Sequence, residues 1–311
     1  MENAQSLKKR LKSIGNINKI TKAMELVAAT KMRRSQEIAL ASRPYAFTAL
    51  DLLANLSLLK NKVVPAILKK RKVQNTLLVL VASDKGLAGA FNSSLFKKFE
   101  KYIAGQGERN PAFVAVGEKT ATYLSRKGLP VVRKFTNVGD FTSAEQIKPL
   151  ADFLVDGYVS KQWDKVVVFS MHFKSALKQD ATVHQVLPVT FESIKETIKE
   201  ILPETGKFAD MIKERQIDFA SKKADINEYT IEPSPAKVFE DLARHLLFMQ
   251  VYHVILEANA SEHSARRLAM KTASDNASDL GQALNLQYNK VRQASITNQI
   301  IEISAGAEAL S

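Results

Sequence analysis

Few residues of this 311-residue chain have types and spacing that could do chemistry. The segment 83–92, SDKGLAGAFN, follows an apolar run and precedes a helical pattern, which is where an α/β sheet often holds a phosphate. Its glycines stand at positions 86 and 89, so it matches neither the dinucleotide-binding nor the P-loop fingerprint. The pattern favours a tight structural turn or a protein contact, and nucleotide binding is the alternative.

The other candidate catalytic residues are isolated. The five histidines show no H-E-x-x-H spacing, and His245 and His253 on one helix face favour packing over metal ligation. Glu257 and Glu262 are interpreted as solvated helix charges, because nothing else marks a substrate pocket near them. The chain contains no cysteine, which excludes disulfides and thiolate chemistry. We therefore predict no catalytic residue, no metal site and no cofactor.

The middle of the chain alternates strand and helix patterns. Short apolar runs rich in β-branched residues predict buried strands at 76–82, 112–116, 130–135, 165–173 and 184–189. Helical patterns lie between them at 93–103, 118–126 and 143–160. This alternation predicts an α/β domain with helices on the faces of a parallel or mixed sheet.

Both ends of the chain predict long helices. Residues 236–311 contain no proline and two glycines, so they predict one helix of roughly 110 Å. A helix of that length needs a partner helix. Residues 2–43, which precede Pro44, offer one. Apolar or small residues at steps of three and four predict the contact faces. These are Leu7, Leu11, Ile14, Ile17, Ile20, Met24 and Val27 at the N-terminal end, and Leu242, Leu246, Met249, His253, Leu256, Ala269, Ala273, Ala277, Leu280, Leu284, Tyr288 and Val291 at the C-terminal end.

The predicted fold is therefore α/β, with a long antiparallel two-helix coiled coil from the N- and C-terminal helices and an inserted Rossmann-like α/β domain. Residues 1–59 form the N-terminal helix, 73–192 the α/β domain and 233–311 the C-terminal helix. Residues 193–232 form a charged helical or loop insertion, either a solvated excursion or a regulatory contact.

The charge is uneven along the chain. The net charge is +13, and residues 1–40 carry nine basic against three acidic side chains, which indicates an anionic partner surface. Nucleic-acid binding or a scaffold role is one alternative, and a nucleotide-dependent enzyme built on the α/β domain is another. Residues 236–311 carry seven basic and eight acidic side chains, which disfavours nucleic acid. The first residues do not predict a signal peptide, and no apolar run is long enough for direct membrane insertion. The chain is thus expected in a cytoplasm-like compartment.

Three separated segments resemble one known family. ITKAMELVAATKMRRSQ (20–36), SDKGLAGAFN (83–92) and SEHSARRLAMKTASDNA (261–277) with RQASIT (292–297) and EISAGAEAL (302–310) are similar to motifs of the gamma subunits of F-type ATP synthases. The resemblance implies a central rotor shaft that couples proton-driven rotation of the c-ring to conformational cycling of the catalytic beta subunits. It implies as partners the ring of three alpha and three beta subunits, the epsilon subunit and the membrane c-ring. It also implies a non-catalytic, peripheral protein on the cytoplasmic face of the bacterial plasma membrane.

The resemblance also implies which residues contact partners. The family's contact positions correspond to Met24 and Lys85, and to Arg292, Gln293 and Thr297 near the C-terminal end. Lys85 stands where the family commonly has arginine, which weakens a bidentate contact. The chain also departs from the family at Ala88, Ala90 and Gln299, the last of which replaces a frequent glutamate.

Overall fold

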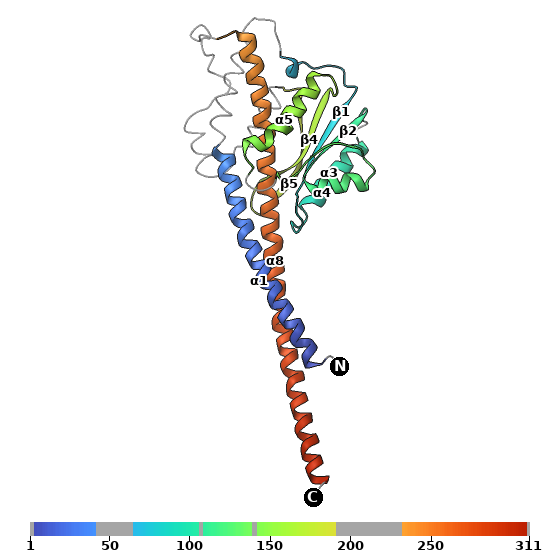
Figure 1. Ribbon diagram of the computed structural model, residues 1–311, viewed down its shortest axis with the longest axis vertical. Coiled ribbons are helices and arrows are strands. Elements are labelled where there is room, and N and C mark those ends of the chain that lie inside the picture. Colours follow the sequence, from blue (N-terminus) through green and yellow to red (C-terminus); the bar gives the residue numbers. More distant parts are fainter. Residues whose placement is uncertain (1–2, 42–64, 106–107, 139–141, 191–231, 310–311) are drawn as a thin grey trace. The chain divides into compact units, whose positions relative to one another are not determined.

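The computed structural model describes residues 3–41, 65–105, 108–138, 142–190 and 232–309. They belong to two compact units, one formed by Met1–Ala29 with Arg266–Ser311 and the other by Thr30–Ala265. Figure 1 labels most of the helices and strands of both units. Residues 42–59 of the predicted N-terminal helix lie outside the described residues, as does the predicted insertion 193–232 except for its last residue.

The unit Thr30–Ala265 is built on a five-stranded sheet in the order β3-β2-β1-β4-β5. The pairs β3–β2, β2–β1 and β1–β4 are parallel, and β5 runs antiparallel to β4. The predicted Rossmann-like α/β fold is therefore confirmed. The elements of the unit are β1 (Thr76–Val81), α3 (Phe91–Gly105), β2 (Pro111–Val116), α4 (Glu118–Arg126), β3 (Val131–Phe135), α5 (Ala144–Val159), β4 (Lys165–Phe173) and β5 (Gln179–Leu187), with a short helix η1 (Ala66–Leu68) before β1.

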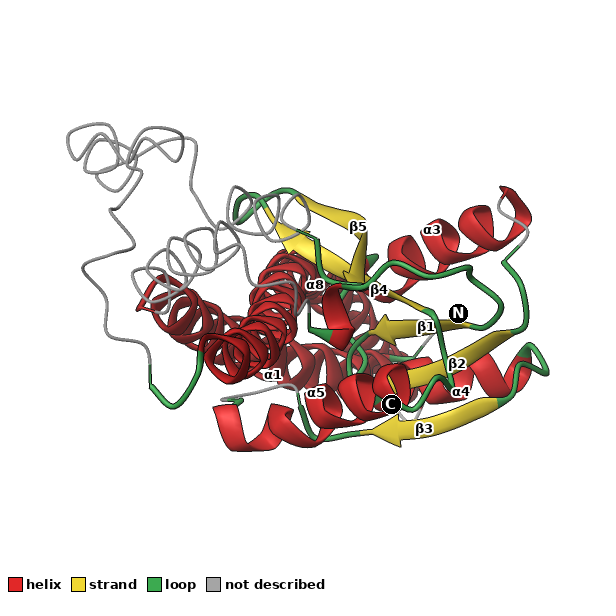
Figure 2. Ribbon diagram, turned by 90° about the horizontal axis from the view of Figure 1, so that it is seen from above, coloured by secondary structure: helices red, strands yellow, loops and turns green. Residues whose placement is uncertain are grey.

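The central strand β1, with sequence TLLVLV, is buried along its whole length because helices cover both faces of the sheet. Leu77 and Val79 point into one apolar core, which α5 and the first part of the C-terminal helix α8 (Pro235–Ala309) complete. Leu78 and Leu80 point into the other, which α3 and α4 complete. Figure 2 shows this arrangement of helices on the two faces.

The sequence prediction was wrong at the last strand, whose start was placed at residue 184. The strand β5 begins at Gln179, because its polar first half pairs with β4 from Gln179 opposite Phe173 onward. The first six residues of β5 are only half-buried, as expected at a sheet edge. They therefore lack the apolar run on which the prediction depended. The helix Glu118–Arg126 and the strand Lys165–Phe173 have the predicted bounds.

The other unit consists of two antiparallel helices, the first part of α1 (Ala4–Ala41) and the last part of α8. The 75 residues of α8 make it about 112 Å long at a rise of about 1.5 Å per residue. Ser274 bonds Asn18, and a methyl group of Ile14 lies 3.7 Å from the position that a Cβ on Gly281 would take. As the residue number falls on α1 it rises on α8, which confirms the antiparallel pairing.

The contact between the two helices follows a heptad pattern with alternating steps of three and four residues, which is typical of a left-handed coiled coil. We call these positions the seam. In the unit Met1–Ala29 with Arg266–Ser311 they are all half-buried or buried. The seam consists of Leu7, Leu11, Ile14, Asn18, Thr21, Glu25 and Ala28 on α1 and of Met270, Ser274, Ala277, Gly281, Leu284, Tyr288 and Val291 on α8.

The predicted apolar face was wrong in the middle of α1. The structure exposes Ile17, Ile20 and Val27, and Ile20 is 59% exposed. From Ile14 to Val27 the predicted stripe averages about 3.25 residues per step, so it drifts around the helix, whereas a seam needs about 3.5. Leu280 on α8 is also exposed, because the seam passes through Gly281 between Ala277 and Leu284. In the middle of α1, polar residues such as Thr21 and Glu25 therefore occupy the seam, and apolar residues such as Ile20 face outward.

A glycine fixes the connection between β2 and α4. Gly117 adopts φ +91°, and a Cβ there would lie 2.1 Å from the carbonyl oxygen of Ala82, so a side chain cannot be accommodated. This close approach sets the start of α4 against the loop that follows β1. Among the described residues, no helix has a stretch long and apolar enough to cross a membrane.

Candidate functional site

Among the described residues, no helix lies beside the end of α8. In the antiparallel seam, Asn18 lies beside Ser274 and Ile14 beside Gly281, so the start of α1 at Ala4 corresponds to about residue 290 of α8. From residue 292 to residue 307 every side chain is exposed. This unpaired end includes Ile300 and Ile303, the latter 73% exposed. Apolar side chains in such a row are typical of a surface that a partner covers.

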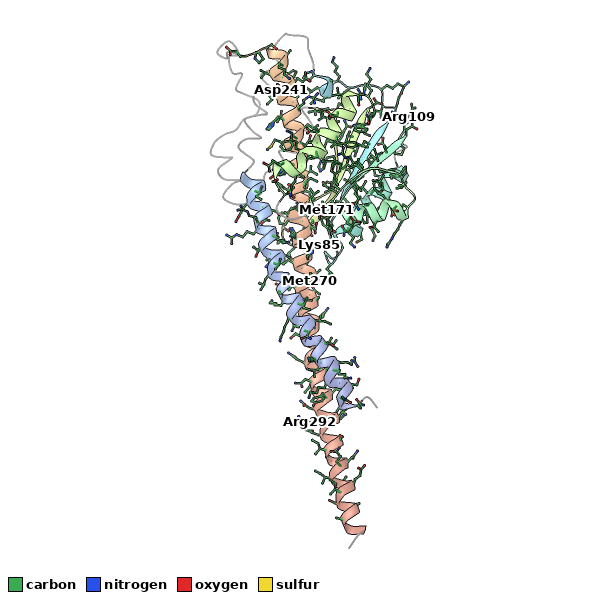
Figure 3. All side chains as sticks on the ribbon, viewed as in Figure 1. Lys85, Arg109, Met171, Asp241, Met270 and Arg292 are labelled. Atoms are coloured by element: carbon green, nitrogen blue, oxygen red, sulfur yellow. The ribbon has the colours of Figure 1, made fainter. Side chains whose placement is uncertain are left out.

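Three of the predicted contact residues lie together on this unpaired end. Arg292, Gln293 and Thr297 are all exposed, and the hydroxyl of Thr297 donates a hydrogen bond of 3.0 Å to the backbone oxygen of Gln293. Figure 3 shows Arg292 on the part of α8 beyond the start of α1. The guanidinium of Arg292 presents five N–H donors and is suited to a carboxylate on another chain.

Met24 does not join this group. It is half-buried on α1 next to the seam residue Glu25, in the stretch of α1 that lies beside about residue 270 of α8. The 22 residues from there to Arg292 correspond to about 33 Å along the helix. A hydrogen bond from Lys22 at 2.9 Å holds the pKa of Glu25 below its ordinary value. Met24 and Arg292 therefore belong to two separate surfaces of one unit.

Lys85 belongs to the other unit, on the loop that follows β1 at the carboxyl edge of the sheet. Its side chain is exposed, and Figure 3 marks its place. Ser83 and Asn92 fix the base of the loop, since their side chains bond each other at 2.7 Å and the Ser83 hydroxyl donates to the backbone oxygen of Lys85. The loop therefore presents Lys85 from a rigid base.

The same loop bears on the nucleotide alternative. The carboxylate of Asp84 accepts a hydrogen bond of 3.0 Å from the backbone N–H of Glu118, the first residue of α4. A helix N-terminus attracts anions, and here the protein supplies its own carboxylate. A phosphate at this helix end would have to displace Asp84. The Asp84 carboxylate thus ties the loop to the start of α4, whereas the helix that the loop itself precedes is α3.

Sequence analysis missed one residue of this loop. Leu87 lies at the loop tip with φ +62° and is 64% exposed. A leucine in left-handed backbone conformation costs free energy, about 1–2 kcal/mol, and such strain often accompanies a functional contact. The sequence signal was an apolar residue between two glycines at positions 86 and 89.

A second missed feature is a buried charged cluster on α8. The sequence interpretation of Glu257 and Glu262 as solvated charges was wrong, because the side chain of Glu257 is 15% exposed and Glu262 is 5% exposed. One carboxylate oxygen of Glu257 lies 2.7 Å from Nδ1 of His172 on β4, and the other lies 3.1 Å from Nε2 of His253. Solvation was expected because nothing in the sequence near these residues marks a pocket, and His172 lies 85 residues from Glu257.

The cluster has a definite protonation pattern. Burial raises the pKa of Glu257, but hydrogen bonds from His172 and His253 outweigh burial and lower the pKa to about 2. An ionised carboxylate only accepts hydrogen bonds, so Nδ1 of His172 and Nε2 of His253 both carry hydrogen. Among the described residues, no group of three or more His, Asp or Glu side chains could hold a metal ion. The cluster is therefore a hydrogen-bonded clasp between β4 and α8.

Comparison with known proteins gives a consistent result. The ATP synthase family model matches residues 3–310. The ATP synthase gamma chain of Chlorobaculum tepidum is 34% identical over 100% of this chain and 99% of its own length, and that of Opitutus terrae is 36% identical over 98% of each chain. A solved chain from the Euglena gracilis mitochondrial ATP synthase shares the fold, with a TM-score of 0.63, 17% identity, and coverage of 99% of this chain and 94% of that chain.

Proposed function

The chain belongs to the ATP synthase family and groups with its gamma chains, and from this membership we propose that it is the central rotor shaft of an F1Fo ATP synthase. The observation that carries the proposal is the extent of the match, which covers residues 3–310 and so includes both long helices as well as the α/β fold. The proposed role is to couple proton-driven rotation of the c-ring to conformational cycling of the catalytic beta subunits. The chain itself is proposed to be non-catalytic.

The unpaired end of α8 supports this role. A single helix that exposes Ile300 and Ile303 beside polar residues such as Gln293 can lie inside a ring of other subunits and contact each of them differently. Three identical sites around one asymmetric helix then have three different environments. A ligand or contact shifts a conformational equilibrium by its differential affinity for the two states, so an asymmetric shaft biases each catalytic subunit differently.

The energetics require a shaft that transmits rotation over several steps. Moving one charge across 100 mV yields about 2.3 kcal/mol, so several proton steps must be summed for each ATP formed. A pair of packed helices is stiffer in torsion than one helix alone, because the seam must shear before either helix twists. The seam from Leu7 to Ala28 supplies this packing along α1.

The proposed partner contacts follow from the family positions. Met24, Lys85, Arg292, Gln293 and Thr297 are proposed to contact the ring of three alpha and three beta subunits. The α/β unit is proposed to bind the epsilon subunit and the c-ring. The protein is then a peripheral component on the cytoplasmic face of a bacterial plasma membrane.

Reconstitution tests the proposal directly. We expect the purified chain to assemble with alpha and beta subunits into one complex that hydrolyses ATP faster than the alpha and beta subunits alone. The control is the same mixture without the chain, and gel filtration with ATPase assays provides the readout. A chain that stays separate from the alpha and beta subunits under these conditions would contradict the proposal.

A further inference from the structure

Within the unit Thr30–Ala265, the first part of α8 packs on one face of the sheet through an apolar stripe. Leu247, Val251, Val254 and Ala258 are buried there against strand residues such as Val79. Apolar contact is not directional, so by itself it permits a helix to roll or slide at modest cost. Two rows of polar contacts, one on each side of the stripe, restrict these movements.

The first row is the Glu257 row, formed by Glu257, Ser261 and Ser264. Glu257 accepts hydrogen bonds from His172 and His253, as described above. It connects α8 to β4 by a charge-assisted bond of 2.7 Å, which is the stronger type of hydrogen bond. All three members of the row are buried or nearly so.

The row continues along the hairpin of β4 and β5. The hydroxyl of Ser261 donates to the backbone oxygen of Met171 at 3.3 Å, and that of Ser264 donates to the backbone oxygen of Ala176 at 2.7 Å. The side chain of Gln179 donates in turn to the Ser264 hydroxyl at 3.3 Å. The Glu257 row therefore bonds α8 to the hairpin at three successive turns of the helix.

The second row is the Asn259 row, formed by Tyr252 and Asn259. The amide of Asn259 donates to the backbone oxygen of Val138 and to the hydroxyl of Thr142, both at 2.9 Å. The hydroxyl of Tyr252 donates to the backbone oxygen of Thr142 at 3.1 Å. These bonds reach the segment between β3 and α5, which is a different part of the unit from the hairpin.

The positions of the two rows follow from helix geometry. At about 100° per residue, the apolar stripe is centred about 100° from Glu257, and Asn259 and Tyr252 lie about 200–220° from it. The two rows thus flank the stripe on its opposite edges. A rotation of α8 in either direction about its own axis would stretch bonds in both rows.

The size of this restraint can be estimated. The side-chain ends lie about 5–6 Å from the helix axis, so a rotation of about 20° moves the Glu257 carboxylate by about 2 Å. A 2.7 Å bond stretched by that amount no longer exists. Each apolar contact of the stripe is worth only about 0.1–0.2 kcal/mol per pair of atoms, so it resists the same movement less than the charge-assisted bond does.

We propose that the Glu257 row and the Asn259 row lock α8 against rotation about its own axis on the sheet, and that torque enters the shaft helix at this place. The inference rests on the proposed rotor function and identifies the residues that would carry the load within the α/β unit. Glu257 is the central positioning residue, since one carboxylate joins β4 and α8.

The test replaces the clasp by apolar side chains in the full complex. The variant H172L/H253L/E257L removes two imidazoles and one carboxylate together, a kind of change that is often neutral for stability. We measure ATP hydrolysis and ATP-driven proton pumping by F1Fo complexes in sealed vesicles. The expected result is an unchanged melting temperature and hydrolysis that persists, with a clear loss of protons pumped per ATP.

A matched control removes a similar cluster that does not touch α8. Glu108 accepts hydrogen bonds from Thr76, Tyr102 and Lys165 within the sheet unit, at 2.8, 2.6 and 2.8 Å. The variant E108L/K165L should keep its pumping per ATP. Equal pumping by the wild type and the triple variant, both folded, would overturn the inference, and so would an equal loss in the control.

Two further measurements complete the design. If the wild-type complex itself does not pump protons, the result contradicts the proposed function and not the inference about the two rows. If the triple variant does not fold, E257Q, which keeps the shape and removes the charge, replaces it in the same assay. Since the chain has no cysteine, H172C/E257C joined by a short bis-maleimide should restore pumping relative to the unlinked form. No recovery in the linked form would contradict the lock.

Discussion

The hydroxyl of Ser274 on α8 donates a hydrogen bond of 2.7 Å to the side-chain oxygen of Asn18 on α1, although 256 residues separate the two in sequence. Ser274 is 6% exposed, so the bond lies inside the seam. A hydrogen-bonded polar pair within the seam is directional, and it selects one register over the alternatives that shift α1 by a heptad. The pair thus sets which residues of α8 remain beyond the start of α1.

The first prediction concerns this pair. Asn18→Ala and Ser274→Ala should each lower the free energy of unfolding by about 1 kcal/mol, because each leaves its partner without a hydrogen bond in the seam. The double variant should show a coupling energy of about 1 kcal/mol in a double-mutant cycle measured by urea unfolding. Ser278→Ala, at an exposed position of α8, is the control and should change little. Additive effects of the two changes would contradict the prediction.

The second prediction concerns two glycines inside helices. A Cβ on Gly281 would lie 3.7 Å from Ile14, an ordinary contact, so Gly281→Ala should raise stability by about 0.5–1 kcal/mol by removing the glycine penalty. A Cβ on Gly157 would lie 1.9 Å from the indole of Trp163, so Gly157→Ala should lower stability. Thermal unfolding of both variants checks the two opposite signs. A loss of stability in Gly281→Ala would show that the seam is packed more tightly there than the structure indicates.

The third prediction concerns the unpaired end of α8. Arg292→Ala together with Gln293→Ala should impair ATP hydrolysis or rotational coupling of the complex while assembly persists. Both side chains are exposed, so the change should leave the folding of the chain itself intact. Lys290→Ala, exposed on the same helix just before this end, is the matched control. Full activity and coupling in the double variant would remove these two residues from the proposed contacts.

The fourth prediction concerns pH. The pKa of Glu257 is lowered from 4.5 to about 2 in the folded chain, so its contribution to stability is present above about pH 4.5 and is lost as the pH falls toward 2. A shift of that size corresponds to about 3 kcal/mol. The difference in unfolding free energy between the wild type and Glu257→Gln should therefore shrink between pH 5 and pH 2.5. A difference that stays constant over this range would show that the charge of Glu257 contributes nothing.

Local sequence patterns predicted most of the secondary structure. The β-branched run Lys165–Phe173 and the amphipathic segment Glu118–Arg126 formed the predicted elements with the predicted bounds. In each segment the residue types fit one kind of element, a buried strand or an amphipathic helix, and the residues on either side mark its ends. The start of β5 at Gln179 was missed because its first half pairs at a sheet edge, where polar residues are tolerated.

The candidate site was predictable only in part. The identity of Arg292, Gln293 and Thr297 as contact positions came from the resemblance of short motifs and remains a prediction. The strained backbone at Leu87 has a weak signal in the two adjoining glycines. The clasp at Glu257 has no such signal in the sequence. Its carboxylate can be buried because the fold brings the imidazole of His172 to it from a distant strand.

The amino-acid sequence by itself determined the order of the described elements, the length of the C-terminal helix and the family, since these depend on local periodicity, on the absence of helix breakers and on motifs in a fixed order. The tertiary structure decided which side of α1 forms the seam and which charges are buried. Ile20 faces outward while Asn18 and Thr21 face α8. The reason is that a seam follows the period of about 3.5 residues that two helices share, and hydrophobicity alone does not set that period.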